Sequence, residues 1–275
     1  MKHWVVLLSF LVLSLFIASM ISERTHVEFS NTGNSHTNIM MKDIQWFFLT
    51  TGLNTTRREH MLEEFKDFRI QEVNPVLSDD QTISRVQSVA TGFLRMIDRG
   101  LRGQDTTKPF QPFVLLEDDA SKFRTIPHSI NIPVNCDLLY IGLSTVGAPD
   151  DEDWKKANGS KAFYTPFDNN LIKIHNMLAM HGIMVCSSAG ANLITRCTSE
   201  GFYTNTVCDV PLAISLSLYN VYALIEPLVY QDKRYDGQES ATKITANSLK
   251  EHAGDFNPSN SIHKSFARAT SSLRK

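Results

Sequence analysis

An acidic triplet, Glu117-Asp118-Asp119, follows directly on the apolar run Phe113-Val114-Leu115-Leu116. Adjacent carboxylates repel one another and resist burial, so they need water or a bound cation at the end of a strand. In open α/β sheets the carboxyl ends of the strands form the ligand crevice. Carboxylate oxygens suit Mn²⁺ or Mg²⁺, and such ions bridge protein carboxylates and substrate phosphates. The triplet therefore predicts a metal-assisted phosphate site, with a solvated acidic turn as the alternative.

Strand-like and helix-like segments alternate along the chain and would position this triplet. Apolar, strand-forming runs predict strands at residues 44–50, 70–76, 113–116, 137–143, 183–186 and 219–225. Helical spacing of apolar residues and capping residues predict helices at residues 56–68, 86–101, 187–198 and 209–217. This alternation predicts one α/β domain with a mainly parallel central sheet.

The N-terminal residues predict a membrane anchor. Residues 4–21 carry no charge, and at ~1.5 Å per residue such a helix would span about 27 Å, close to the thickness of a bilayer core. We expect residues 1–21 to be an uncleaved signal-anchor, a single transmembrane helix of type II orientation, and a cleaved signal peptide is the alternative. The body would then face the Golgi or ER lumen or the secretory pathway, and sequons at Asn54 and Asn158 agree with that location.

Composition shifts along the chain divide the remainder into three parts. Residues 22–42 are polar and predict a stem, residues 43–231 form the predicted catalytic domain, and residues 232–275 predict a polar, disordered tail. The net charge of −2 argues against nucleic acid as a partner. Four cysteines without metal-ligand spacing argue against a zinc site, and a Cys197–Cys208 disulfide and buried free thiols are both open.

Several motifs in order resemble glycosyltransferase family 25, which includes lipooligosaccharide and procollagen galactosyltransferases. The resemblance covers residues 44–231, beginning with Asn54 and an Arg-bearing helix. It continues through the runs Phe113-Val114-Leu115-Leu116-Glu117-Asp118-Asp119-Ala120, Asp137-Leu138-Leu139-Tyr140-Ile141-Gly142, Ser187-Ser188-Ala189-Gly190-Ala191-Asn192-Leu193-Ile194 and Pro227-Leu228-Val229-Tyr230-Gln231. It implies a GT-A-like nucleotide-diphospho-sugar transferase fold, and transfer of galactose or glucose from a UDP-sugar to a hydroxyl of a glycan or protein.

The resemblance also implies roles for particular residues. Asp119 would bind Mn²⁺ or Mg²⁺, Glu117 would share the metal or face the ribose, and Asp118 would complete the donor site. Asp209 occupies the family's acidic position and would act as the general base of an inverting displacement, although an acidic residue ahead of Pro211 is also typical of a helix N-cap. Arg57 and Arg58 would reach the diphosphate, or would be solvated charges on a surface helix.

Two features keep other functions open. The family's G-C-x-x-S-H segment is replaced here by residues 87–93, which lack both Cys and His, so a catalytically inactive sugar-nucleotide or glycan-binding relative is one alternative. The run around Ser188 echoes the nucleophile elbow of serine esterases. Ser188 would then be the nucleophile of a hydrolase, with a triad completed by Asp209 or Asp236 and by His252 or His263.

Overall fold

The computed structural model describes residues 35–51, 54–77, 82–148, 162–232 and 234. The predicted anchor at residues 1–21, most of the predicted stem and all but two residues of the predicted tail lie outside this part of the chain. Within the described residues, no helix combines the length and the apolar character needed to cross a membrane.

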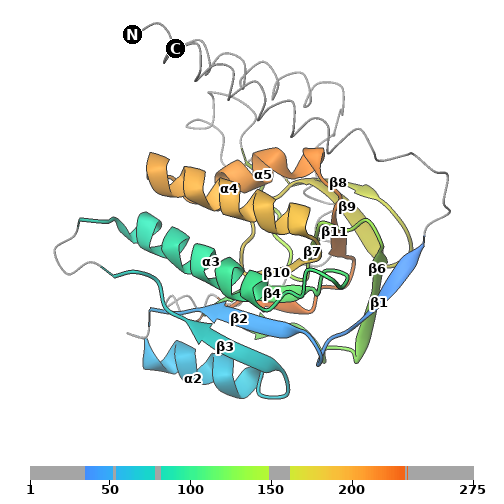
Figure 1. Ribbon diagram of the computed structural model, residues 1–275, viewed down its shortest axis with the longest axis horizontal. Helices are drawn as coiled ribbons and strands as arrows, with labels where there is room; N and C mark the ends of the chain where they lie inside the picture. Colours follow the sequence, from blue (N-terminus) through green and yellow to red (C-terminus); the bar gives the residue numbers. More distant parts are fainter. Residues whose placement is uncertain (1–34, 52–53, 78–81, 149–161, 233, 235–275) are drawn as a thin grey trace, which may run out of the picture. The chain divides into compact units, whose positions relative to one another are not determined.

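The described chain forms four α-helices, a short 3₁₀ helix and twelve strands (Figure 1). The helices are α2 (Thr55–Glu64), α3 (Arg85–Arg102), α4 (Ser188–Thr204), α5 (Asp209–Ser215) and the 3₁₀ helix η2 (Leu216–Leu218). The strands are β1 (His36–Met40), β2 (Gln45–Leu49), β3 (Arg69–Val73), β4 (Phe113–Glu117), β5 (Ala120–Lys122), β6 (Ser129–Pro133), β7 (Leu138–Tyr140), β8 (Phe163–Pro166), β9 (Leu171–Asn176), β10 (Gly182–Val185), β11 (Val221–Leu224) and β12 (Val229–Gln231).

Eight of these strands make one central sheet in the order β3-β2-β4-β10-β7-β11-β9-β8. The pairs β3–β2, β2–β4 and β7–β11 are parallel, and the other four pairs are antiparallel. Because β10 and β9 alone run against the rest, six of the eight strands point in one direction. The expected α/β class and main strand direction are thus confirmed, but the sheet is mixed in its hydrogen bonding.

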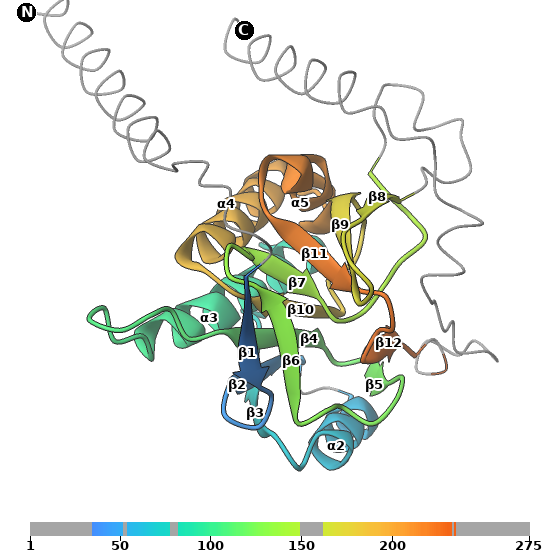
Figure 2. The ribbon, with the colours of Figure 1, turned by 90° about the vertical axis from the view of Figure 1, so that its right-hand side faces the viewer.

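Alternating side chains of the central sheet pack into two separate hydrophobic cores, one on each face of the sheet. Phe47, Phe113 and Leu115 face the layer of α3, α4 and α5, whereas Trp46 and Val114 face the opposite core. The second core contains α2 residues and the two-stranded β1–β6 ribbon (Figures 1 and 2). This three-layer arrangement follows from strands that are apolar on both faces.

The predicted elements of the first half match the structure closely. The helix expected at residues 86–101 is α3, which begins at a capping box: Ser84 Oγ accepts from Gln87 N–H, and the Gln87 side chain accepts from Ser84 N–H. The helix expected at residues 56–68 is α2, although Asn54 rather than Thr56 caps it. Residues 36–40, which the composition placed in the stem, form β1 instead, because they pair with β6.

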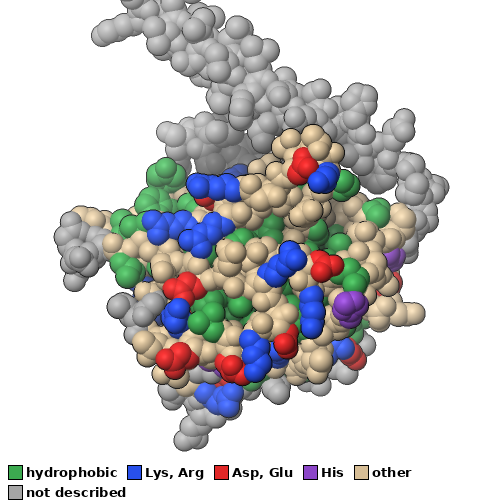
Figure 3. All heavy atoms as spheres, turned by 60° about the horizontal axis from the view of Figure 1, so that its bottom comes forward, with side chains coloured by type: hydrophobic (Ala, Val, Ile, Leu, Met, Phe, Trp, Pro, Cys, Tyr) green, Lys and Arg blue, Asp and Glu red, His purple; other side chains and the backbone are tan. Residues whose placement is uncertain are grey.

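The surface shows charged side chains of both signs. On the face seen in Figure 3, Lys and Arg side chains are interspersed with Asp and Glu. This mixture agrees with the small net charge of the chain.

All four cysteines are free thiols, so of the two alternatives for Cys197 and Cys208 the structure has buried free thiols and no bridge. The Cys197 thiol contacts Ser215 Oγ at 3.9 Å, across the α4–α5 contact. Burial raises the pKa of Cys197 and raises that of Cys208 to about 12. Both side chains belong to the helix-side core, as expected for cysteine acting as a small apolar residue.

Gly190 allows α4 to approach the sheet, and its substitution is expected to destabilise the fold. A Cβ at this position would lie 2.1 Å from the backbone oxygen of Asp137. We expect Gly190→Ala to lower the free energy of unfolding by about 1–3 kcal/mol, as overpacked cores do. Urea unfolding followed by circular dichroism measures this change.

Gly103 provides the matched control for that measurement. It follows α3 with φ −81°, and an added Cβ would meet no atom closer than 3.9 Å. Gly103→Ala is expected to change stability by no more than about 0.5 kcal/mol. Equal effects of the two substitutions would refute the close approach at Gly190.

Candidate functional site

The acidic triplet lies where the sequence predicts, at the carboxyl end of a central strand. Glu117 is the last residue of β4 and pairs with Leu49 of β2. Strand alternation places the Glu117 side chain on the same face as Leu115, toward α3 and α4. Asp118 and Asp119 then form the turn into β5. Because β2, β3, β4 and β7 all end at this edge, it is the crevice edge of the sheet.

Asp119 is buried and is fixed by a segment more than a hundred residues away. Its side chain is only 5% exposed, and its Oδ2 accepts a hydrogen bond from Gln231 Nε2 at 3.0 Å. The Asp119 carbonyl oxygen accepts from Asp232 N–H at 2.7 Å. These bonds extend the antiparallel pairing of β5 with β12 (Figure 2). The triplet is therefore not a freely solvated turn.

The predicted start of the tail, Asp232, lies among these hydrogen bonds between the β5 and β12 segments. Asp232 is buried, and its carboxylate accepts from Ser121 Oγ at 3.3 Å. Hydrogen bonds from Arg234 hold the pKa of Asp232 at about 2. Ser121 also contacts His60 Nε2 at 2.9 Å. No motif or spacing signalled these contacts, because they join α2, β5 and the residues after β12.

The two arginines of α2 contact different carboxylates. Arg57 Nη1 lies 2.9 Å from Asp118 Oδ1, and both side chains are less than one fifth exposed. Arg58 Nε lies 2.5 Å from Glu72 Oε2 on β3, and the Arg58 side chain is 43% exposed. Successive helical residues point about 100° apart, and the two guanidinium groups accordingly have different partners in this structure. Arg57 belongs to the acidic segment, and Arg58 lies apart from it.

Asp209 comes to the same edge of the sheet through the path of the chain. Strand β10 runs against β4, so α4 returns toward the carboxyl edge and α5 begins there with Asp209. Both Asp209 and Glu117 act electrostatically on Cys208, whose pKa is raised first by burial and then by these two carboxylates. The two candidate residues, 92 positions apart in the sequence, thus share one neighbourhood.

The environment of Asp209 favours its protonated form. Burial raises the pKa of Asp209, and the backbone N–H groups of Asp209 and Val210 offset only part of this effect. Asp209 is the first residue of α5, and the preceding N-cap position is Cys208. A carboxyl with a raised pKa near a cluster of acidic residues is typical of a proton acceptor in catalysis.

Three buried polar atoms in this region have no hydrogen-bond partner within the described part of the chain. They are Asp209 Oδ1, the Tyr140 hydroxyl and Thr198 Oγ1. Burial raises the pKa of Tyr140, and the Asp209 carboxylate raises it further. Polar atoms left in this way are normally satisfied by ordered water or by a ligand. These three polar groups lie among residues of the helix-side core.

The donor atoms at this edge fit a hard cation that takes most of its ligands from elsewhere. Glu117 and Asp119 offer carboxylate oxygens, whereas Asp118 is paired with Arg57. Within the described residues, no three His, Cys, Asp or Glu side chains are placed to hold a metal ion by themselves. Mg²⁺ and Mn²⁺ are commonly bound by one or two carboxylates together with substrate phosphate and water, so a cation at this edge would take its other ligands from a substrate and water.

The alternative site at Ser188 does not assemble with Asp209. Ser188 is the first residue of α4 and is exposed. Helix α4 is 17 residues long, which corresponds to about 25 Å at ~1.5 Å per residue, and Asp209 follows its far end. Ser187 caps α4 and donates to Asp137 Oδ1 at 2.7 Å. The Ser-Ser-Ala-Gly run is thus a helix start, and the hydrolase triad through Asp209 is excluded. The other candidates, Asp236, His252 and His263, lie outside the described residues.

No family model and no curated protein sequence matches this chain. Among solved structures, it is similar to a CTP:phosphocholine cytidylyltransferase from Streptococcus pneumoniae, with a TM-score of 0.38 and 9% sequence identity. That similarity covers 68% of this chain and 92% of the other. The topology itself defines the class of this protein, a mixed α/β fold with a central sheet between two helical or ribbon layers.

Proposed function

We propose that this protein is a GT-A-type, metal-dependent glycosyltransferase that transfers galactose or glucose from a UDP-sugar to a hydroxyl of a glycan or protein. One observation carries the proposal: Asp119 is buried at the carboxyl end of β4 and clamped by Gln231, while Asp209 reaches the same edge with a raised pKa. A structural acidic turn would require neither the burial nor the second carboxyl. We further propose that residues 1–21 anchor the protein in a Golgi or ER membrane with the catalytic domain in the lumen.

The residues of this edge would divide the work between donor and acceptor. Asp119 and Glu117 would hold Mn²⁺ or Mg²⁺ and orient the diphosphate, while the Arg57–Asp118 pair would border it. When bound, the cation supplies positive charge that stabilises the departing diphosphate. Asp209 would take the proton of the acceptor hydroxyl on the opposite face of the sugar.

Transfer of the sugar proceeds by a single displacement with inversion at the anomeric carbon. The acceptor oxygen forms a bond to that carbon as the bond from the carbon to the UDP oxygen breaks. UDP leaves with the bonding electron pair, and the acceptor proton passes to Asp209.

A screen of nucleotide sugars tests this function directly. The full-length protein in detergent, with Mn²⁺ present, is expected to hydrolyse UDP-galactose or UDP-glucose slowly and to release UDP. Chelation with EDTA should stop UDP release, and added Mn²⁺ should restore it. Binding of UDP-sugar without any hydrolysis or transfer would instead support an inactive sugar-nucleotide-binding relative. That alternative arises because residues 87–93 lack the Cys and His of the family's segment.

The two α2 arginines provide a matched pair of variants. We expect Arg57→Gln to raise the KM for the UDP-sugar at least tenfold, because it removes a charge beside the acidic segment. Arg58→Gln, which alters the contact with Glu72, is expected to leave this KM within twofold. Steady-state kinetics of UDP release measures both. A larger effect at Arg58 than at Arg57 would place the diphosphate elsewhere.

A further inference from the structure

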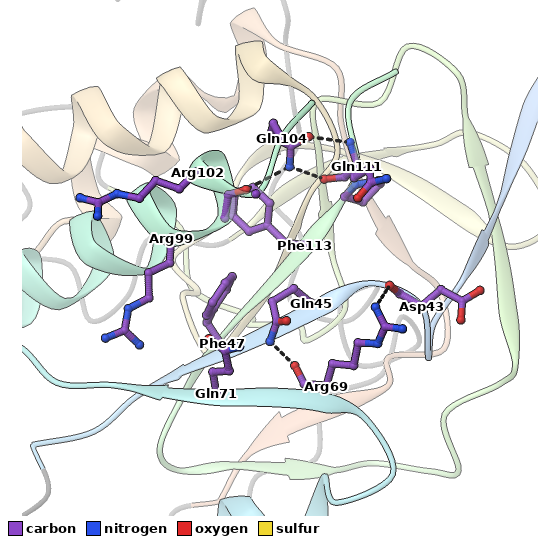
Figure 4. Close-up of a pocket in the computed structure, with 13 residues that line it drawn as sticks. Asp43, Gln45, Phe47, Arg69, Gln71, Arg99, Arg102, Gln104, Gln111 and Phe113 are labelled. Atoms are coloured by element: carbon purple, nitrogen blue, oxygen red, sulfur yellow. Dashed lines mark hydrogen bonds between the residues drawn. The ribbon is translucent and has the colours of Figure 1, made fainter. Parts of the chain in front are cut away.

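A hollow lies at the opposite edge of the sheet from the acidic triplet. It has a volume of about 390 Å³ and is bounded by the starts of β2, β3 and β4 and by the last turn of α3 (Figure 4). Four residue steps along β4, from Phe113 at the hollow to Glu117, correspond to roughly 13 Å. The volume is within the usual range for small-molecule sites.

The strand register assembles the polar wall of this hollow. Gln45 on β2 pairs with both Arg69 on β3 and Phe113 on β4, so these three side chains form a row across the sheet. Gln71 stands two residues further along β3, on the same face as Arg69. Helix α3 ends at Arg102, and residues of its last turn form the opposite wall.

Two arginines in the hollow lack an acidic partner. Arg99 Nη1 donates to the Glu72 carbonyl oxygen at 2.8 Å, and Arg69 Nη1 contacts the Asp43 carbonyl oxygen at 3.5 Å. Within the described part of the chain neither forms an ion pair with a carboxylate, whereas Arg102 pairs with Asp98. Figure 4 shows Asp43 beyond Arg69, at the rim. The hollow therefore carries positive charge that an anion would neutralise.

The carboxamides of the hollow fall into two groups. Gln104 is fully engaged, since it donates to Gly100 and Gln111 carbonyl oxygens and accepts from Gln111 N–H. The side chains of Gln71 and Gln111 form no hydrogen bond to any described residue, and both are exposed. Each such amide can donate to one hydroxyl and accept from another. An inorganic anion alone would leave these amides unused.

The base of the hollow is apolar and is held tightly. Phe47 and Phe113 lie there with side chains that are almost fully buried, and their rings pack edge to face at 6.1 Å. Gly100 allows the end of α3 to reach Phe113, because an added Cβ would lie 2.7 Å from the ring. The base is therefore rigid and closed by the protein itself, and the exposed amides and guanidinium groups of the wall are the groups that can contact a ligand with hydroxyls and a negative charge.

We propose that this hollow binds an acidic saccharide, a sugar unit bearing a carboxylate or sulfate group. Arg69 and Arg99 bind the anionic group, and Gln71 and Gln111 bind hydroxyls. The site is separate from the proposed transfer site, and its occupancy does not depend on catalysis. It would hold a glycan chain against the protein at a distance from the reacting sugar.

Isothermal titration calorimetry at low salt tests this binding with defined probes. The probes are a hyaluronan tetrasaccharide with carboxylates only, a chondroitin 4-sulfate tetrasaccharide with both anionic groups, neutral chitotetraose and inorganic sulfate. We expect one or both acidic tetrasaccharides to bind, with at least tenfold weaker binding of chitotetraose and of inorganic sulfate. The preferred tetrasaccharide identifies the anionic group.

Another arginine of α3 provides the matched control. Arg69→Gln combined with Arg99→Gln is expected to weaken binding of the acidic tetrasaccharide at least tenfold. Arg95→Gln, which loses a comparable contact with the Asn74 carbonyl oxygen outside the hollow, should bind within twofold of the parent. Hydrolysis of UDP-sugar should be unchanged in both variants, so a failed transferase assay leaves the binding result interpretable.

Three outcomes would overturn the acidic-saccharide site. The first is absence of binding by both acidic tetrasaccharides to the parent protein. The second is equal binding by the parent and the double variant. The third is inorganic sulfate binding as tightly as either tetrasaccharide, which would reduce the hollow to a simple anion site.

Discussion

Replacing Asp119 with asparagine is expected to reduce Mn²⁺-dependent hydrolysis of the UDP-sugar by roughly three orders of magnitude. This loss corresponds to about 4 kcal/mol of transition-state stabilisation, as expected when the charge that holds a catalytic cation is removed. Asparagine keeps the side-chain shape and an oxygen that can accept from Gln231 Nε2. The measurement is the rate of UDP release at saturating Mn²⁺, with the thermal melting curve recorded on the same sample.

The control for this experiment is a carboxylate on helix α3 that has no part in the proposed site. Asp98 is exposed and pairs with Arg102 one helical turn away, so Asp98→Asn should leave the rate of UDP release unchanged. A folded Asp119→Asn protein that hydrolyses the donor at the parent rate would refute both the metal site and the transferase proposal.

Replacing Asp209 with asparagine is expected to lower the rate of transfer about 10²- to 10⁴-fold, the range usual for loss of a general base. The amide cannot take the acceptor proton, while its size and position at the start of α5 are retained. Transfer to an added acceptor, followed by chromatography of the product, measures the effect. Binding of UDP and Mn²⁺ should remain within a few-fold of the parent, because Asp209 is assigned to the acceptor side.

Stability should change in the opposite direction to activity. The pKa of Asp209 in the folded protein is raised above its ordinary value of 3.8 by burial. Between these two pKa values the folded chain binds more protons than the unfolded chain, so the free energy of unfolding falls as pH rises through this window. Above the folded pKa the full cost of the buried charge is present. Asp209→Asn removes this cost, so the variant should melt at a higher temperature at pH 7 and lose that advantage below about pH 3.8.

The combined effects on stability and activity distinguish a catalytic role of Asp209 as general base from a structural role at the start of α5. A variant that loses stability at pH 7 and keeps full transfer activity would identify Asp209 as a structural residue at the start of α5. A gain in stability with loss of transfer is the pattern of a buried catalytic group, because active sites retain charges that the fold alone would not favour. The acid limb of kcat/KM in the parent should lie above pH 3.8 and disappear in the variant.

Prediction from the sequence succeeded where the signal was local. The apolar run ahead of Glu117 identified β4, and the apolar stripe after Ser84 identified α3. It missed β1, β6 and the β8–β9 hairpin. Strands β1 and β8 contain no fully buried residue, and β1 pairs with β6, which is distant in the chain. The Ser188 motif misled for a related reason: the same Ser and Gly residues serve a helix cap and a close approach to the sheet.

The sequence by itself determined the α/β class, the position of the acidic triplet at a strand end and the acidic character of residue 209. Each depends on side-chain type and on spacing within one or two elements, which the linear order preserves. Only the tertiary structure decided that Asp119 is buried under Gln231, that Arg57 and not Arg58 contacts the triplet, and that Asp209 shares its edge. These relations follow from β10 running against β4 and from the pairing of β5 with β12, and long-range pairing leaves no periodic trace in the sequence.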